Sequence, residues 1–389
     1  MSFSSRRRFL QYASLTSLGV AAAKLGGCAS SPQDTATGGE ATPSAAKGST
    51  IRVLSWPGYE DKAVISKFEQ DTGTRVEFKN YVGGEQMLQL VSQSPPGTYD
   101  SIVADAEYLP KLMALGVIEP LKVEDFPEFS NYVPAYQQMP LFYDQGKMMA
   151  IATRYGFYGM AYNTDVVSAD QANDWNFLLS PELKGKVAMF DWYLPNMGDF
   201  SLAVFPNREN PYDLTDAELQ KVKEWMLKLK PNMSLISQNF QDVTNSFLTG
   251  GVIAAPIGDW LIQNLVADGH TNFTAVIPKQ GAIRWSEGAT LAGSSKNKPQ
   301  TLEWMRYMTQ AEPQARLANV AASKCQVPNL KAIDLMDEAE KSLLGYVPDP
   351  KVSGKTVAEV KTAATTPRRL PVQQSDKVWQ DIYNEFKTS

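Results

Sequence analysis

The chain has 389 residues, with 37 basic and 42 acidic side chains, two Cys and one His. The acidic balance argues against a nucleic-acid partner, which requires a basic surface. The single His, His270, nearly excludes zinc and haem sites of the usual kinds and limits catalysis by Ser-His-Asp or Cys-His groups. We therefore expect no metal, no cofactor and no enzymatic activity.

The first 28 residues combine three features of an exported lipoprotein. The motif S-R-R-R-F-L at residues 5–10 matches a twin-arginine export signal, and residues 12–25 are apolar but too short to span a bilayer. The motif L-G-G-C at residues 25–28 matches a lipobox, in which the Cys becomes lipidated. We interpret residues 1–27 as a signal peptide and Cys28 as the lipidation site. This predicts a membrane-anchored lipoprotein in the periplasm or at the cell surface.

Residues 28–49 are rich in Ser, Thr, Ala, Gly and Pro and predict a flexible tether. Without the signal peptide, 33 basic residues face 42 acidic ones, a net charge of −9 that is compatible with a cationic ligand. The body from residue 50 to residue 389 is about 340 residues long, which predicts two domains.

The first part of the body alternates predicted strands and helices. The strands are 51–55, 74–78 and 99–104, and the helices are 61–70, 85–92 and 108–115. This order predicts an α/β fold with a parallel sheet. Ligands of such sheets bind beyond the carboxyl ends of the strands. Trp56, Tyr59, Asp105 and Glu107 follow the first and third strands and are therefore expected at that edge.

The second part begins with a long strand-like run at 148–163, which can pass between two lobes. Strand 186–190 delivers Asp191, and strand 252–257 ends at Asp259 and Trp260. The remaining predicted elements are strand 273–278 and helices 213–229, 240–248, 299–310, 313–321 and 377–387.

Several motifs occur in a fixed order along the body: S-W-P-G-Y at 55–59, F-E-Q-D-T-G-T-R-V at 68–76, Y-D-S-I-V at 99–103, P-E-L-K-G-K at 181–186, V-I-P-K-Q-G at 276–281 and V-P-N-L at 327–330. In this order they resemble bacterial extracellular solute-binding proteins of the spermidine/putrescine-binding type. The resemblance covers nearly the whole chain after the signal peptide.

The resemblance implies a type II-like periplasmic-binding-protein fold, in which two α/β lobes close on a ligand cleft. Lobe 1 is expected to hold 50–154 and 286–330, and lobe 2 to hold 155–285 and 331–389. It further implies a polyamine ligand, a monomer, and a partner in the membrane permease of an ABC importer.

The resemblance also implies a cleft with aromatic and acidic side chains. Ring faces attract ammonium groups by about 0.5–2 kcal/mol, and a desolvated ammonium needs a carboxylate. In this chain Trp260 lies within two residues of the family's Trp, so that match is shifted, and acids replace the family's small polar and aromatic pair after the third strand. The predicted ligand contacts are Trp56, Tyr59, Asp105, Glu107, Asp191, Asp259, Trp260, Trp285 and Glu287.

Other interpretations stay open at this point. The aromatic residues can be core residues of the lobes, and the acids can be turn or cap residues. The same scaffold can bind an amino acid, thiamine, Fe(III) or a phosphonate. An exported enzyme and a peptide-sheltering or structural lipoprotein are the remaining alternatives.

Overall fold

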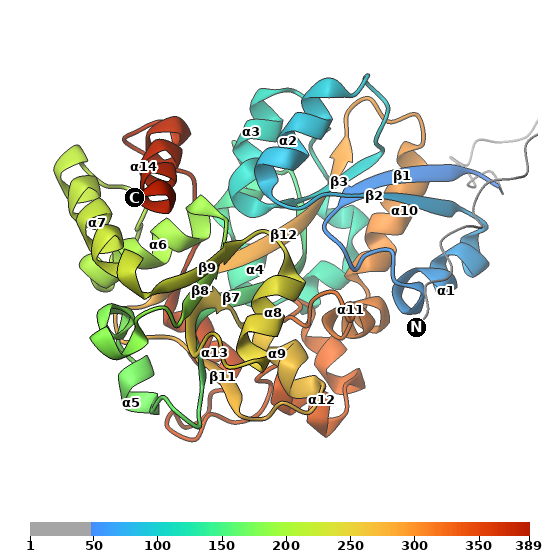
Figure 1. Ribbon diagram of the computed structural model, residues 1–389. Coiled ribbons are helices and arrows are strands. Elements are labelled where there is room, and N and C mark those ends of the chain that lie inside the picture. Colours follow the sequence, from blue (N-terminus) through green and yellow to red (C-terminus); the bar gives the residue numbers. More distant parts are fainter. Residues whose placement is uncertain (1–47) are drawn as a thin grey trace, which may run out of the picture. The chain divides into compact units, whose positions relative to one another are not determined.

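The computed structural model describes residues 48–389 (Figure 1). The predicted signal peptide, the twin-arginine motif, Cys28 and most of the predicted tether lie outside the described residues. Between residues 48 and 389, no helix combines the length and the apolar character needed to cross a membrane.

The first part of the body folds as the sequence predicts, into parallel strands connected by helices. Strand β1 pairs in parallel with both β2 and β3, with Ile51 opposite Val76 and Val53 opposite Ser101. The elements are β1 (Thr50–Ser55), α1 (Lys62–Thr72), β2 (Arg75–Asn80), α2 (Gly84–Gln93), β3 (Ser101–Asp105), the 3₁₀ helix η1 (Ala106–Tyr108) and α3 (Leu109–Ala114). The prediction of an α/β fold is confirmed.

Local sequence explains where these helices begin and end. Helix α1 starts after Asp61, whose side chain accepts a hydrogen bond from the Ala63 backbone N–H at 2.8 Å. It ends at Gly73, which has a φ of 71° that glycine adopts readily. The residues next to the first helix therefore determine where it begins and ends.

The rest of the chain extends the same sheet, except that β5 and β6 form a separate two-stranded sheet. The middle elements are β4 (Ile118–Glu119), α4 (Pro134–Gln137), β5 (Tyr143–Asp144), β6 (Lys147–Met148), β7 (Ile151–Asn163), α5 (Ala169–Ala172), β8 (Val187–Phe190), α6 (Tyr193–Val204), α7 (Asp216–Leu229), β9 (Met233–Ser237), α8 (Phe240–Leu248), β10 (Ala254–Gly258), α9 (Asp259–Ala267), β11 (Phe273–Val276) and β12 (Ala282–Ala292). The last elements are α10 (Lys298–Thr309), α11 (Ala311–Ala318), α12 (Glu338–Leu343), α13 (Val357–Ala363), β13 (Thr365–Pro367) and α14 (Asp376–Thr388).

Strands β7 and β12 join the two parts of the sheet, whose main path is β2-β1-β3-β12-β7-β10-β8-β9. Strand β12 pairs antiparallel with β3 on one side, with Glu287 opposite Asp105, and with β7 on the other. Strand β7 in turn pairs with β10 and β11. Side chains of β7 and β12 therefore lie at the middle of the sheet.

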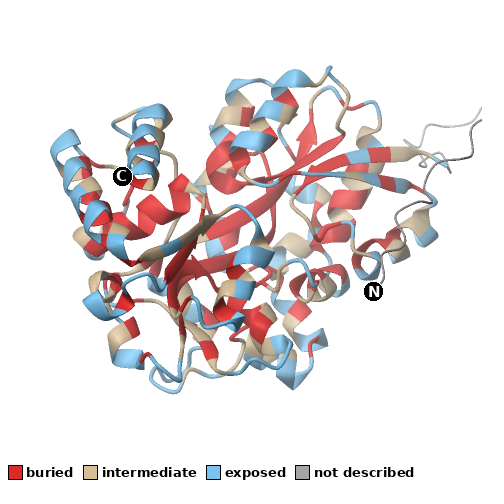
Figure 2. Ribbon diagram, viewed as in Figure 1, coloured by how far each residue is buried: buried red, intermediate tan, exposed pale blue. Residues whose placement is uncertain are grey.

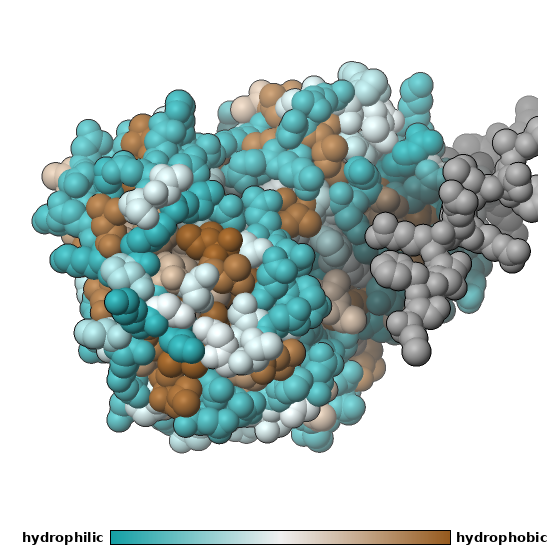
Figure 3. Space-filling view, viewed as in Figure 1, coloured by the Kyte–Doolittle hydropathy of each residue, from teal (hydrophilic) through white to brown (hydrophobic). Residues whose placement is uncertain are grey.

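Strand β12 is absent from the elements that the sequence predicts. Most residues of β12 are buried, although the strand includes the charged residues Arg284 and Glu287 and the small residue Gly288. Apolar and polar residues therefore do not alternate along it as they do in a half-buried strand. Figure 2 shows this burial along the centre of the sheet, with exposed residues on the outer helices. Figure 3 shows that the visible surface is mainly hydrophilic, with small apolar groups that include one near β8 and β9.

Candidate ligand-binding cleft

A cavity of about 1150 Å³ opens where β1, β3 and β8 end beside the middle of β7 and β12. This volume lies slightly above the roughly 300–1,000 Å³ that is usual for small-molecule sites. The carboxyl ends of parallel strands are the expected binding edge of an α/β sheet. The topology therefore places polar and aromatic side chains from distant segments around one cavity.

Seven of the nine predicted contact residues line this cavity, which are Trp56, Asp105, Glu107, Asp191, Trp260, Trp285 and Glu287. Their contact with a ligand stays a prediction. The structure brings them together because each follows or lies on a strand that reaches the cavity.

Asp105 and Glu107 share one internal cation, Arg368. The Arg368 Nη2 atom lies 2.9 Å from Asp105 Oδ1, and Arg368 Nε donates to Glu107 Oε1. The other Asp105 oxygen accepts a hydrogen bond from Trp56 Nε1 at 3.2 Å. Glu107 Oε2 is buried and has no hydrogen-bond partner in the described part of the chain. Of these two acids, Glu107 therefore has one carboxylate oxygen without a partner in the described chain.

Burial sets the protonation behaviour of these two acids. It raises the pKa of Glu107 to about 8, although Arg368 acts in the opposite direction. It also raises the pKa of Asp105, again against the effect of Arg368. A further cation near Glu107 would favour its ionised form.

Glu287 has an internal partner of its own. Its Oε2 atom accepts hydrogen bonds from Tyr59 OH at 2.9 Å and from Arg154 Nε at 3.0 Å. Both members of the Arg154–Glu287 pair are buried, with side-chain exposures of 2% and 5%. Burial raises the pKa of Glu287, and Arg154 lowers it. We call the five buried side chains Asp105, Glu107, Arg154, Glu287 and Arg368 the charged floor.

Tyr59 and Asp259 do not line the cavity, unlike the other seven predicted contacts. Tyr59 is fully buried beneath Arg154, whose guanidinium lies 4.7 Å from the ring centroid. Asp259 accepts from the Phe157 backbone N–H at 3.2 Å, and its other oxygen lies 3.6 Å from Lys361 Nζ. Both side chains bond neighbouring residues, and their contact with a ligand stays a prediction.

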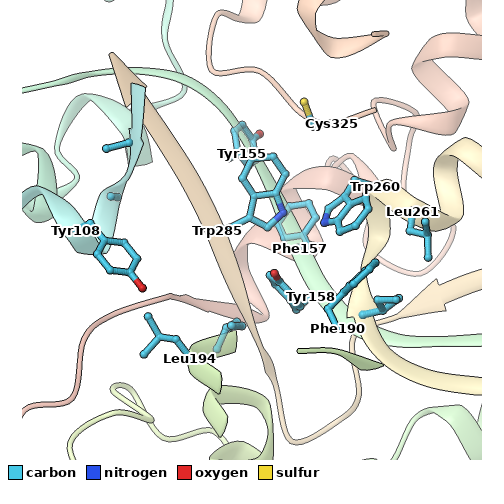
Figure 4. Packing of buried hydrophobic residues seen from close by; sticks show 14 of the residues in the cluster. Tyr108, Tyr155, Phe157, Tyr158, Phe190, Leu194, Trp260, Leu261, Trp285 and Cys325 are labelled. Carbon is cyan, nitrogen blue, oxygen red and sulfur yellow. The ribbon is translucent and has the colours of Figure 1, made fainter. Parts of the chain in front are cut away.

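Aromatic rings form one side of the cavity. Trp192 stacks on Phe190 with centroids 4.7 Å apart and meets the edge of Trp56 at 5.9 Å. Trp260 stacks on Phe190 at 5.3 Å and contacts Phe240 at 5.2 Å, as Figure 4 shows for the first pair. We call these five residues the aromatic wall, in which Phe190 lies behind the rings that line the cavity.

Trp285 projects from β12 against β7, where Gly156 lies opposite it (Figure 4). A Cβ atom at Gly156 would lie 2.7 Å from the indole, so only glycine fits beneath this ring. The indole Nε1 is buried and has no hydrogen-bond partner among residues 48–389. Trp285 therefore lines the cavity and carries a buried N–H donor without a partner in the described chain.

Among the lining residues that were not predicted as contacts are Arg154, Trp192 and Arg368. Two of them had signals in the sequence: Arg154 lies within the strand-like run 148–163, and Trp192 directly follows strand 186–190. Arg368 has no such signal, because it lies between β13 and α14 in a segment without a motif. Its place depends on the pairing of β13 with β12.

At the rim of the cavity, Asp191 pairs with Lys387 of α14 at 2.8 Å, and both side chains are partly exposed. In the part of the chain that the structure describes, no three metal-binding side chains gather into a group that could hold an ion. The cleft thus consists of a charged floor, an aromatic wall and a solvated rim.

The family model for bacterial extracellular solute-binding proteins matches residues 63–343. The chain belongs to this family. A similar protein is the spermidine/putrescine-binding periplasmic protein 1 of Haemophilus influenzae, which is 24% identical over 269 residues, 69% of this chain and 72% of that protein. The predicted family is confirmed, and its description names the binding of solutes and no catalysis.

Solved structures show the same fold. An ABC transporter protein of Listeria monocytogenes superposes with a TM-score of 0.73 at 20% identity, covering 87% of this chain and 98% of that one. The substrate-binding protein PotD of Streptococcus pneumoniae gives 0.70 at 18% identity, with 87% and 99% covered. The predicted two-lobe fold of periplasmic binding proteins is therefore confirmed, while the residue limits of the lobes stay a prediction.

Proposed function

We propose that the protein is the substrate-binding component of an ABC importer and captures a small cationic amine, with spermidine and putrescine as the first ligands to test. The observation that carries this proposal is the charge of the cavity. Six acidic and four basic side chains line the cavity. The acids are Glu85, Asp105, Glu107, Asp191, Asp268 and Glu287, and the bases are Arg154, Lys324, Arg368 and Lys387. The names of the curated relatives support the same ligand class.

The chemistry of the lining fits an amine. Glu107 Oε2 is a buried acceptor without a partner in the described chain, and an ammonium group would supply the missing donor. The aromatic wall offers ring faces, each contributing about 0.5–2 kcal/mol to the binding of a cation. One end of the ligand would then lie at the charged floor and its methylene groups against the wall.

The alternative ligands are less well supported by the lining. A ferric site built on tyrosinates needs ionised Tyr side chains, but burial raises the pKa of Tyr108, Tyr158 and Tyr193. A purely anionic ligand would meet Arg154 and Arg368, which are already paired with carboxylates.

Calorimetry of the purified protein against amines, amino acids, thiamine and Fe(III) tests the proposal. We expect heat with an amine, and a Glu107→Gln variant should bind that amine at least about tenfold more weakly because an anionic acceptor is lost. Glu85→Gln is the matched control, since this exposed acid also lines the cavity and should change affinity little. Heat with another ligand class but with no amine would contradict the proposal.

We also propose lipid anchoring through Cys28, export through the twin-arginine signal, delivery of the ligand to a membrane permease, and a monomeric state. These proposals rest on the sequence motifs and the family. Cys28→Ala should release the protein from the membrane fraction, whereas Cys325→Ala, which changes a buried thiol, should not. Equal membrane retention of both variants would contradict the anchor.

A further inference from the structure

The charged floor carries one more acid than base. Asp105, Glu107 and Glu287 are buried with only two buried cations, Arg154 and Arg368. We propose that the cleft selects an amine with a single positive charge and a hydrogen-bond acceptor at its other end, and that Arg368 sets this limit. This inference rests on the proposed amine-binding function and narrows its ligand class.

The guanidinium of Arg368 occupies the position beside two acids that a second ammonium group of the ligand would otherwise take. Its guanidinium bonds both Asp105 and Glu107, and its backbone N–H donates to the Arg284 carbonyl of β12 at 2.9 Å. The residue is 7% exposed, so the segment holds it inside the cavity lining. One ammonium then neutralises the remaining negative charge of the charged floor, and a second ammonium bound at the floor would be buried without a counter-charge.

Two donors without partners in the described chain belong to residues that line the cavity, and we assign them to the other end of the ligand. Trp285 Nε1 and Arg154 Nη1 are buried without hydrogen-bond partners among the described residues, and both side chains line the cavity. An unpaired buried donor is destabilising, and an acceptor on the ligand would offset this cost. Amides, carboxylates and hydroxyls supply such acceptors.

Helix N-termini add to this preference for an acceptor. Helices α6, α8 and α9 begin at the cavity, where Tyr193, Phe240 and Trp260 line it in their first turns. The N-terminal end of a helix carries a partial positive charge, which favours acceptor or anionic groups. The ligand class is therefore a mono-acylated diamine rather than a free polyamine.

Three probes with the same four-carbon chain separate charge from acceptor: putrescine has two charges, N-acetylputrescine has one charge and an amide, and butylamine has one charge and no acceptor. Calorimetry at pH 7 should show N-acetylputrescine binding at least about tenfold tighter than either of the others. Putrescine binding as tightly as N-acetylputrescine would overturn the inference and leave amine binding in place. No heat with any amine would instead contradict the proposed function.

Two variants test the role of Arg368. Arg368→Gln leaves three buried acids with one cation, so the preference for N-acetylputrescine over putrescine should fall by about tenfold. The double variant Glu107→Gln/Arg368→Gln restores an excess of one acid and should restore the wild-type preference between the two probes. If the single variant fails to fold, the double variant and the three probes still decide the matter. An unchanged preference in folded Arg368→Gln would show that Arg368 only fixes the C-terminal segment.

Discussion

The charged floor and the aromatic wall face the same cavity but are built in different ways. Each floor cation pairs with an acid far along the chain, Arg368 with Glu107 across 261 residues and Arg154 with Glu287 across 133. Wall residues instead stand at the ends of single elements, as Phe190 does at the end of β8 and Phe240 at the start of α8. Floor residues thus depend on specific partners, whereas wall residues contribute apolar area that neighbouring rings can partly replace.

The largest effect is expected where the floor loses one member of a buried pair. Arg154→Met should lower the free energy of unfolding by about 3–5 kcal/mol, because Glu287 would remain buried without its cation. Urea denaturation followed by circular dichroism measures this change.

The matched control for this variant removes both charges. Arg154→Met/Glu287→Gln should recover most of the lost stability, since no unpaired charge remains. If the unfolding free energy of Arg154→Met stays within about 1 kcal/mol of the wild type, the charged floor tolerates substitution as well as the aromatic wall does. The difference between floor and wall would then be contradicted.

A wall residue should give a smaller and graded effect. Trp192 is only partly buried, so Trp192→Ala should cost about 2 kcal/mol of stability, less than truncation of a fully buried Trp. Loss of the ring face should weaken amine binding by about 3- to 30-fold, as calorimetry would measure. Trp192→Phe should retain most of both properties.

Trp225 offers a control for the wall, because it is buried against Phe200 and does not line the cavity. Trp225→Ala should reduce stability while leaving amine affinity within about twofold of the wild type. If both Trp variants reduced affinity equally, the loss at Trp192 would reflect general destabilisation and not contact with the ligand.

This contrast also explains what sequence can predict. The strand and helix pattern before residue 116 predicted the parallel sheet, and the ends of strands β1, β3 and β8 located Trp56, Asp105 and Asp191 at the cavity. Those predictions need only local periodicity and the rule for α/β sheets.

Pairing between distant segments was not predictable in the same way. Nothing near Asp105 in sequence indicates that Arg368 neutralises it, because that contact depends on β13 lying beside β12. The sequence also did not indicate that Glu287 accepts hydrogen bonds from Tyr59 and Arg154; whether Glu287 and Tyr59 contact the ligand stays a prediction. The residue types of the site could be predicted from sequence, whereas the charge left available for a ligand required the structure.

The protonation of Glu107 sharpens the difference between floor and wall. Burial raises its pKa from the usual value near 4.5 to about 8, so the free protein should lose stability as pH rises from about 4.5 through 8. An ammonium ligand favours the carboxylate, so amine affinity should increase over the same range, by up to about tenfold per pH unit when one proton is released.

Calorimetry in two buffers of different ionisation enthalpy detects the released proton. Glu107→Gln should abolish the release and flatten both pH profiles, whereas the wall variant Trp192→Phe should keep them. A wild-type affinity that is constant between pH 5 and pH 8 would show that the ammonium group does not bind beside Glu107.

The smallest effect is expected at the rim, where Asp191 and Lys387 form a pair that solvent partly screens. Asp191→Asn should change the unfolding free energy by less than about 1 kcal/mol, because exposed ion pairs contribute little. Amine affinity should change by less than about threefold, because the rim pair is internally neutral and screened, while the excess negative charge lies at the floor. Lys387→Met, measured beside it by calorimetry, removes the opposite charge and should have a similarly small effect. A tenfold loss in Asp191→Asn with no change in Glu107→Gln would move the ammonium site from the floor to the rim, and the internal pairing of the floor would then be purely structural.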